Sequence, residues 1–276
     1  MQLVEKHIIT NNHKYFNTLD DLLYKSKNLY NATLYAIRQH FFNTGEYLPY
    51  GKLQHIFQND NQFDYRQLPS KVSQWVMKCV DTNFKSFFKG LQEYKKNPSK
   101  FKGKPKLPKY LDKTKGRYML IYTNQAISKR ELINNGIIKL SGTDVVIKTK
   151  VLYEDLCQVR VIKKTNCFVI EVVYNYKEVM PKPDNGKYAS IDLGLNNLVI
   201  MVSNIDKYVP IGISGRKLKS INHYYNKQVS KYKSILEKKN KVKVSKRIQV
   251  LTEKRNNGVD DYLHKASRYI VNQLVS

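Results

Sequence analysis

The feature that most constrains the fold is a short run, residues 188–202, that reads as a strand, a tight turn and a returning strand. Apolar side chains such as Ile191 fill the first strand, Gly194 permits the bend, and a second apolar run begins at Leu198. The run also carries Asp192, and a carboxylate inside an apolar strand is costly to desolvate without a cation or a hydrogen-bond donor. We therefore expect Asp192 to lie at the end of a buried strand with a metal ion as its partner.

Two other interpretations of Asp192 stay open at this point. An aspartate often caps a hairpin turn through its own backbone amides. A strand ending in Asp and Gly also begins the phosphate loop of actin-like kinases, but those kinases follow it with a richer Gly and Thr cluster than the Leu195-Asn196-Asn197-Leu198 turn present here.

The charge of the chain points to a polyanionic partner. The 276 residues include 49 Lys and Arg against 22 Asp and Glu, a formal net charge of +27, and 41% hydrophobic residues, enough to form real cores. No apolar run approaches the roughly 18 to 20 residues of a membrane-spanning helix, and the first residues lack a signal-peptide profile. We therefore expect nucleic acid rather than membrane as the partner, with 21 Tyr as possible stacking surfaces.

Cysteine and histidine usage predicts a reducing, cytoplasmic setting. The chain has three widely spaced Cys and six His, which form neither a disulfide framework nor a zinc-ligand spacing. We expect each His to be an ordinary surface or packing residue.

The N-terminal third reads as one strand followed by helices. Residues 1–10 form a strand pattern, and residues 17–42 carry apolar side chains at helical spacing, with Asn17 as a suitable N-cap. A short helix is expected over residues 53–57. Pro69 and Ser70 then open a second long helix with a broad apolar stripe.

A basic strip rich in Lys, Pro and Gly follows, over residues 94–117, and its prolines exclude a helix. It is either a solvated linker or a partly ordered strip along a phosphate backbone, and the interleaved aromatic residues Phe101, Tyr110 and Tyr118 favour the second. Strand-like runs come next, at residues 118–123, 137–140, 145–148, 159–162 and 168–174. Together with the first strand they predict a small β-barrel.

The last part of the chain combines the Asp192 hairpin with basic helices. A linker around Pro181, Pro183 and Gly186 precedes the hairpin, and a third strand is expected around residues 208–211. Residues 215–276 read as two long helices nearly saturated with Lys and Arg. Because such one-sided charge repels itself, these helices favour contact with nucleic acid over a merely solvated face.

Several motifs, in the same order along the chain, resemble the TnpB family, the insertion-sequence proteins also known as OrfB transposases and regarded as RNA-guided nucleases related to the type V CRISPR effectors. The segments that carry the resemblance are Leu68-Pro69-Ser70-Lys71-Val72, Phe84-Lys85-Ser86-Phe87-Phe88-Lys89-Gly90, Gly103-Lys104-Pro105 to Tyr110, Ile191-Asp192-Leu193-Gly194, Gly215-Arg216-Lys217-Leu218-Lys219-Ser220-Ile221-Asn222 with Tyr225-Asn226-Lys227, and His264-Lys265-Ala266-Ser267.

The resemblance implies an α+β, multidomain fold. Its parts are the first barrel strand (residues 1–15), a helical recognition lobe inserted into the barrel (16–95), the basic strip with the rest of the small β-barrel (96–180), and an incomplete RNase H-like (RuvC) α/β domain with basic helices (181–276). The implied partners are a guide RNA from the transposon end and double-stranded target DNA, without a membrane. The implied setting is the cytoplasm of a prokaryote, with the protein associated with the nucleoid.

The implied chemistry is DNA cleavage with Mg²⁺ ions held by carboxylates, with Asp192 as both catalytic residue and metal ligand. The family also needs a strand-borne Glu and a final Asp after a CxxC zinc ribbon, and the sequence stops at Ser276 before these positions, so zinc ligands are expected only beyond it. The remaining acids Glu253, Asp260 and Asp261 lie in a helical stretch. We therefore expect a truncated chain that binds nucleic acid without cutting it.

The predicted nucleic-acid contacts lie on the strip and on the first basic helix: Lys104, Lys106, Lys109, Arg216, Lys217, Lys219, Asn222, Tyr225 and Lys227. The leading interpretation is a truncated RNA-guided endonuclease. Its alternatives are a nuclease-lacking regulator that acts by binding RNA or DNA and, in another class, an actin-like ATP-dependent kinase, which the charge and the missing second phosphate loop disfavour.

Overall fold

The computed structural model describes residues 1–176, 183–240 and 245–275, and gives only the backbone of residues 239 and 240. The chain divides into two compact units, residues 1–178 and 179–276. Each unit combines helices with antiparallel sheets, so the mixed α and β character expected from the sequence is confirmed. No helix within the described part is long and apolar enough to cross a membrane.

Unit 1 is organised around a four-stranded antiparallel sheet in the order β1-β6-β5-β2. Its strands are β1 (Gln2–Thr10), β2 (Leu120–Thr123), β5 (Leu156–Lys163) and β6 (Cys167–Asn175). The hairpin of β5 and β6 is the centre of the sheet, because β6 pairs with β1 on its other side and β5 pairs with β2. Buried side chains of β5 and β6, such as Val159 and Ile170, supply the sheet's share of the core.

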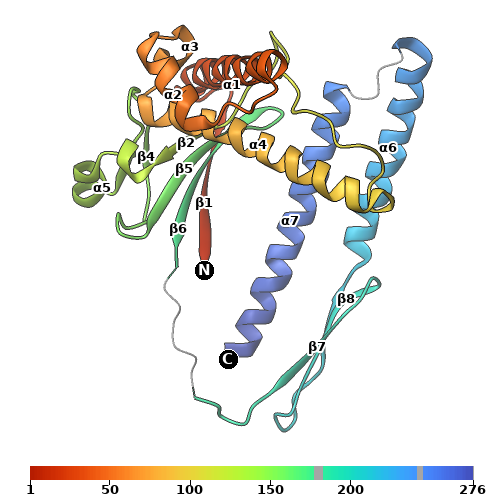
Figure 1. Ribbon diagram of the computed structural model, residues 1–276. Coiled ribbons are helices and arrows are strands. Elements are labelled where there is room, and N and C mark those ends of the chain that lie inside the picture. Colours follow the sequence, from red (N-terminus) through yellow and green to blue (C-terminus); the bar gives the residue numbers. More distant parts are fainter. Residues whose placement is uncertain (177–182, 241–244, 276) are drawn as a thin grey trace. The chain divides into compact units, whose positions relative to one another are not determined.

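Two long helices pack on this sheet (Figure 1). The first, α1 (Phe16–Thr44), contacts β2, β5 and β6, and the second, α4 (Ser70–Lys96), contacts α1 and β2. Both carry apolar side chains at helical spacing, and Leu19, Leu34 and Val72 are fully buried. The predicted long helices are therefore confirmed.

Shorter helices complete the helical part: α2 (Tyr50–Asn59) and α3 (Phe63–Arg66), with the 3-10 turn η1 (Pro98–Lys100) after α4. The prediction of Asn17 as N-cap is wrong, because the N-cap position is Tyr15 and Asn17 lies inside α1. Backbone hydrogen bonds from His13 to Thr10 and from Phe16 to His13 turn the chain directly from β1 into the helix, so the helix begins earlier.

A second sheet, of two strands, is formed by residues between β2 and β5 of the first sheet. It pairs β3 (Ile137–Lys139) with β4 (Val146–Lys148), preceded by η2 (Asn124–Ala126) and α5 (Lys129–Asn135). Ser128 caps α5 by accepting a hydrogen bond from the Glu131 backbone, and Gly136 ends it in the left-handed region. The described strands of unit 1 thus form two open sheets, and β1 and β2 are sheet edges where a closed barrel was predicted.

Unit 2 combines a three-stranded antiparallel sheet with a helical hairpin. The sheet has the order β7-β8-β9, from β7 (Ala189–Leu193), β8 (Asn197–Ser203) and β9 (Ile211–Ser214). The third strand begins at Ile211, the last of the predicted residues 208–211, because a backbone hydrogen bond from Tyr208 to Ile205 closes a turn before it. The helices are α6 (Arg216–Asn240) and α7 (Lys246–Val275), as predicted.

The apolar interior of unit 2 is small. Among its described residues the buried apolar side chains are Val199, Met201, Val229, Ile248 and Ala266. An apolar groove of about 550 Å³ remains open between the turn after β7 and helix α7. Exposed leucines on this turn and helix, Leu193, Leu195 and Leu263, line the groove. Unit 2 therefore buries far less apolar surface per residue than unit 1.

A buried carboxylate joins two helices of unit 1 and provides a test of this packing. Asp81 on α4 is 5% exposed and accepts hydrogen bonds from the Tyr47 hydroxyl (2.6 Å) and the Tyr50 backbone at the start of α2 (3.0 Å), and it pairs with Lys85 (2.7 Å). Burial raises the pKa of this carboxyl, but the three partners outweigh burial and hold the pKa below its ordinary value.

We expect Asp81→Ala to lower the free energy of unfolding by about 2 to 4 kcal/mol at neutral pH, because it leaves buried donors unpaired. Since the folded pKa is depressed, this contribution is present above pH 3.8 and is lost as the pH falls through the folded pKa. Urea unfolding at pH 7 and pH 3 measures both effects. Asp144→Ala, at an exposed turn position, is the matched control, and an equal loss in both variants would contradict the role of Asp81.

Candidate nucleic-acid interface

Asp192 lies on the exposed side of an edge strand. Every residue of β7 is exposed, and among the described strands β7 pairs with β8 alone, so the prediction of a buried strand is wrong. In the register of the hairpin, Ile191 faces Met201 and Asp192 faces Ile200. Because Met201 is buried and neighbouring residues of a strand alternate between faces, Asp192 points away from the apolar face of the sheet.

The turn after Asp192 is closed by the backbone and not by its carboxylate. The Gly194 backbone N–H donates to the Leu198 carbonyl (3.3 Å). No described residue makes a hydrogen bond or ion pair with the Asp192 side chain, so the turn-capping alternative is not what the structure shows. The carboxylate stands free in solvent.

The acidic groups of the chain do not form the expected two-ion set. Among the described residues, no three His, Cys, Asp or Glu side chains come close enough to hold a metal ion. Asp261, on α7, pairs with Lys265 (2.9 Å), and this hydrogen bond holds the pKa of Asp261 below its ordinary value. Asp192 could serve as one ligand of a Mg²⁺ ion, but the residues described here do not fit a complete two-magnesium site.

Helix α6 begins directly against the Asp192 hairpin. The Gly215 backbone N–H donates to the Asn196 carbonyl (2.7 Å), and a Cβ at position 215 would lie 2.2 Å from the Leu195 carbonyl oxygen. Only glycine permits this approach. The Lys219 ammonium also donates to the Asn196 side chain, so the first turn of the basic helix is tied to the hairpin turn.

The two helices of unit 2 form an antiparallel hairpin of constant register. The Arg255 guanidinium donates to Asn222 (2.8 Å) and lies over the ring of Tyr225, whose hydroxyl is 3.0 Å from that of Thr252. Further along, Arg247 lies over the ring of Tyr232 with 4.6 Å between guanidinium carbon and ring centroid. Cation–aromatic contacts therefore replace much of the apolar seam expected between two helices.

The residues of α6 that were predicted to bind nucleic acid fall into two groups, one in the seam between the helices and one exposed to solvent. Asn222 and Tyr225 are half-buried in the seam and already bonded to α7. The cationic residues are exposed: Arg216, Lys217, Lys219 and Lys227. Lys217 also lies over the Tyr262 ring. The outward charges form a basic face on α6, while the two uncharged residues hold the helices together.

In unit 1 the basic strip is an ordered segment, residues 98–117, which we call the strap. It runs back along the end of α4, where Phe101 packs edge-on against Tyr94 with ring centroids 5.7 Å apart and Pro105 lies beside Gly90. It then crosses to α1 and leads into β2. Helix α4 extends to Lys96, so the strap begins slightly later than residue 94. Because the strap packs against α4, it is not the solvated linker of the alternative interpretation.

One face of α1 carries a row of polar residues that bind the strap, which we call the α1 rail: Asp20, Tyr24, Lys27, Asn31 and Arg38. They recur at intervals of three, four or seven residues, and so lie along one side of a helix. Their partners on the strap are, in the same order, Arg117 for Asp20 and Tyr24, the Lys113 carbonyl, the Leu111 backbone, and the Pro108 carbonyl with the Tyr110 ring.

At one end of the rail, two cations bind the carboxylate of Asp20. Arg117 binds both carboxylate oxygens of Asp20, at 2.9 and 2.6 Å, and Lys163 adds a contact at 3.4 Å. The hydrogen bonds from Arg117 hold the pKa of Asp20 below its ordinary value. Lys27 is only 2% exposed, with its ammonium 2.7 Å from the Lys113 carbonyl oxygen and over the Tyr24 ring.

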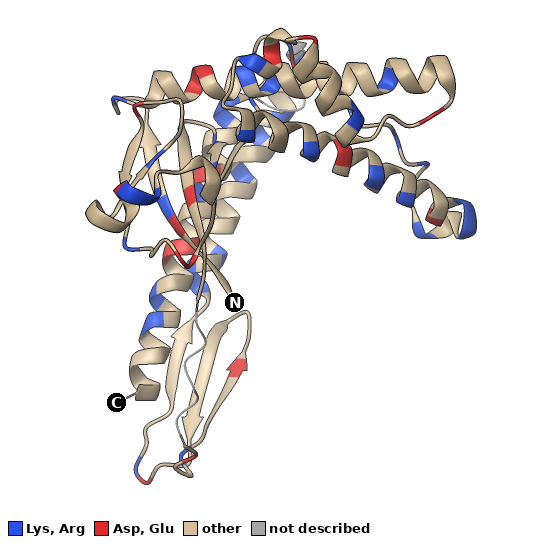
Figure 2. Cartoon of the chain, turned by 60° about the vertical axis from the view of Figure 1, so that its left-hand side comes forward, with Lys and Arg blue, Asp and Glu red and all other residues tan. Residues whose placement is uncertain are grey.

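The strap turns its lysines outward. Lys102, Lys104, Lys106, Lys109, Lys113 and Lys115 are all exposed, whereas Pro105, Leu107, Pro108 and Leu111 are half-buried. Lys and Arg are spread over both units, while Asp and Glu are sparse (Figure 2). The three predicted strap contacts, Lys104, Lys106 and Lys109, thus belong to a row of free ammonium groups on a fixed backbone.

The α1 rail was missed in the sequence. Its only signal was the helical spacing of these polar residues, and Lys27 and Arg38 looked like ordinary surface charges. Sequence spacing does not show that their partners lie roughly 70 to 97 residues away.

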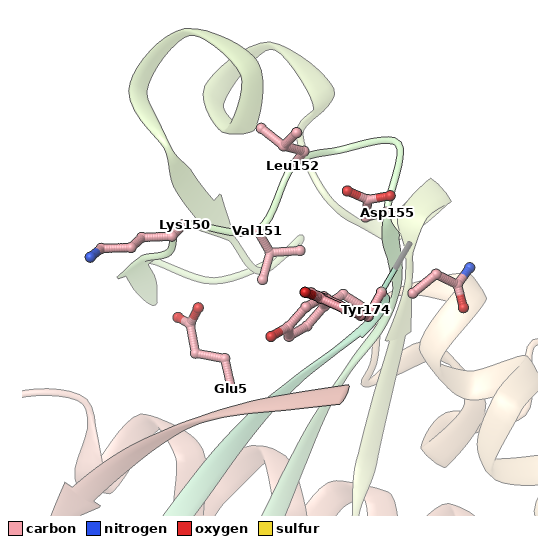
Figure 3. Close-up of a pocket in the computed structure, with 8 residues that line it drawn as sticks. Glu5, Lys150, Val151, Leu152, Asp155 and Tyr174 are labelled. Carbon is pink, nitrogen blue, oxygen red and sulfur yellow. The ribbon is translucent and has the colours of Figure 1, made fainter. Parts of the chain in front are cut away.

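A separate pocket of about 370 Å³ lies beside β1 and β6 (Figure 3). Glu5, Val151 and Tyr174 surround it, while Lys150 points outward. Glu5 already contacts His7 (2.6 Å) and Thr149 (3.1 Å), so its carboxylate is occupied. This pocket presents no set of free catalytic groups.

Comparisons with known proteins identify the C-terminal part. Residues 171–276 match the model of the OrfB_IS605 family, described as a probable transposase. The predicted resemblance is therefore confirmed for this segment, which is similar to the OrfB family. No curated protein matches the chain.

Solved structures also match. A cryo-EM structure of a Cas12f1-sgRNA-target DNA complex is 12% identical, with 99% of this chain and 70% of that chain covered and a TM-score of 0.31. A cryo-EM structure of a CRISPR-Cas12f ternary complex is 12% identical, with coverages of 93% and 61% and a TM-score of 0.33. TM-scores this low do not establish a shared fold.

The ion pair between Asp20 and Arg117 leads to a prediction. We expect Asp20→Asn to lower the free energy of unfolding of unit 1 by about 1 kcal/mol at pH 7, because a charge-assisted, two-point contact with Arg117 is weakened and the pair is partly exposed to solvent. Since the folded pKa of Asp20 is depressed, its contribution is present above pH 3.8 and lost below the folded pKa, so parent and variant should converge in acid.

Urea unfolding across pH 2 to 7 provides the measurement. Asp21→Asn is the control, since Asp21 is next in sequence and pairs only with Lys25 within the helix. A constant difference between Asp20→Asn and the parent at all pH values would contradict the assignment.

Proposed function

We propose that this chain is the nucleic-acid-binding body of a TnpB-like protein, and that the strap lies along the phosphate backbone of a bound RNA. The observation that carries the proposal is the strap itself, whose backbone is held by side chains of α1 while its lysines face solvent. A solvated linker would lack such anchors. The match of residues 171–276 to a probable transposase supports DNA as a partner. The guide RNA is proposed from the resemblance of the sequence motifs to TnpB.

The physical basis is counterion release from a preorganised cation row. Each ammonium that neutralises a phosphate releases a condensed counterion, which makes affinity depend steeply on salt. Because the strap is already ordered, binding would not have to order this segment. Pro105 and Pro108 keep the chain extended, so Lys104 and Lys106 are separated by roughly 6 to 7 Å.

A second contact surface is proposed on unit 2. Arg216, Lys217, Lys219 and Lys227 provide a basic face on α6 next to the Asp192 hairpin. Asn222 and Tyr225 support this face from within the helical seam and are not themselves ligand contacts in this proposal. A nucleic-acid ligand is also the basis for proposing a cytoplasmic, nucleoid-associated location.

The proposed function does not include cleavage by this chain alone. Asp192 would contribute one carboxylate to a magnesium site, where the metal polarises phosphate and activates water. Among the described residues, no three His, Cys, Asp or Glu side chains come together to complete such a site. We therefore propose that the chain binds RNA and DNA, and that hydrolysis requires acidic groups that these residues do not supply.

The strap proposal predicts a change in salt dependence. Replacing Lys104, Lys106 and Lys109 by Gln should weaken binding of a mixed-sequence single-stranded RNA by about 10- to 50-fold at physiological salt. It should also flatten the plot of log K against log salt by about 2, at roughly 0.7 per lost phosphate contact. Filter binding or fluorescence anisotropy over a salt series measures both quantities.

The control variant carries Gln at Lys52, Lys139 and Lys148, which are also exposed and change the net charge equally. Its slope should stay close to that of the parent. Equal losses in the two triple variants would show that overall charge, and not the strap, governs binding.

The cleavage proposal predicts no Mg²⁺-dependent cutting of double-stranded DNA by the purified chain with bound RNA. Asp192→Ala should leave RNA affinity unchanged, because its carboxylate contacts none of the proposed phosphate-binding groups. Gel analysis of labelled DNA with and without Mg²⁺ provides the test. Cutting by the parent that disappears in Asp192→Ala would refute this proposal.

A further inference from the structure

We infer that the α1 rail is a positioning device for RNA binding: Lys27, Asn31 and Arg38 do not touch the ligand but set where the strap lysines stand. This inference rests on the proposed function of the strap and adds residues that carry no phosphate contact. It is drawn from the hydrogen bonds that these three side chains make with backbone atoms of the strap.

Asn31 is the most specific of the three. Its amide nitrogen donates to the Leu111 carbonyl (3.0 Å), and its amide oxygen accepts from the Leu111 backbone N–H (2.9 Å). A two-point contact with one residue fixes both the position and the direction of the backbone there. Leu111 follows Lys109 by two residues, so this contact sets the end of the proposed lysine row.

Lys27 is buried and Arg38 is half-buried, and both cations are engaged by groups of the protein itself. The Lys27 ammonium is enclosed between the Lys113 carbonyl and the Tyr24 ring, and the Arg38 guanidinium donates to the Pro108 carbonyl and lies over Tyr110 at 4.8 Å. A buried charge is retained only where polar partners offset its desolvation. These two cations therefore contribute to binding through the strap's geometry, and not as phosphate contacts.

The rail and the prolines act on different parts of the same segment. Pro105 and Pro108 restrict the backbone torsions of the residues before them, Lys104 and Leu107, while Asn31 and Lys27 hold Leu111 and Lys113. The strap between these anchors has few ways to move without breaking a contact. Breaking the contact between Asn31 and Leu111 should therefore let the strap lysines move apart, without changing the charge of the protein.

The test is a double-mutant cycle that combines Asn31→Ala with the replacement of the strap lysines. Asn31→Ala should weaken single-stranded RNA binding by about 3- to 10-fold and flatten the salt slope by about 1, because fewer lysines reach phosphates at once. Combined with the Lys104, Lys106 and Lys109 replacements, Asn31→Ala should have no further effect on slope. Asn28→Ala, on the same helix but without a described contact to the strap, should match the parent.

The outcomes separate this inference from the proposed function. If the triple lysine variant retains the parent slope, the strap does not bind RNA and the proposed function fails. If the triple variant loses slope but Asn31→Ala binds like the parent, the strap binds RNA and the positioning role is refuted. Additive effects of the two changes would also refute it, since they would mean that Asn31 acts independently of the lysines.

A measurement without RNA checks the mechanism. Limited trypsin digestion should cut after Lys106 and Lys109 several-fold faster in Asn31→Ala than in the parent, because a released strap is more accessible. Asn28→Ala should be cut at the parent rate. Equal cutting rates in Asn31→Ala and the parent would overturn the inference even if RNA affinity changed.

Discussion

The arrangement of unit 1 depends on the contact between one face of α1 and the backbone of the strap. A segment composed largely of Lys, Pro and Gly cannot bury enough apolar surface to order itself. The rail overcomes this by offering hydrogen bonds to backbone groups, above all from Asn31 to Leu111. As a result α1 serves two purposes, because its apolar face builds the core and its polar face orders the segment that carries the proposed contacts.

Unit 2 is held together by the close approach of α6 to the Asp192 hairpin and by cation–aromatic contacts between α6 and α7. Gly215 lets the first turn of α6 meet the carbonyls of the Asp192 hairpin, and Arg247 and Arg255 stack on tyrosines of the facing helix. Basic residues there do two jobs, since some hold the hairpin together and others face solvent. The open edge of β7 and the exposed leucines beside it show that the apolar face of this unit is only partly covered within the described chain.

Much of the fold followed from periodicity. The long helices and the hairpins β5-β6 and β7-β8 were expected because their apolar patterns extend over many residues. Short elements such as α3 and α5 were missed, since four to seven residues carry too little pattern. The buried setting of Asp192 was predicted wrongly, because an apolar strand at the edge of a small sheet has the same local sequence as one at its centre.

The sequence by itself determined the strong positive charge, the positions of the main helices and strands, and the absence of an α-helix from the proline-rich residues after Lys96. It also contained the motifs of the TnpB resemblance. Only the tertiary structure decided which polar residues face solvent and which are used internally, as with Lys27, Asn222 and Tyr225. The physical reason is that a side chain's charge and hydrogen-bonding capacity are local properties, whereas its availability to a ligand depends on partners brought close by the fold.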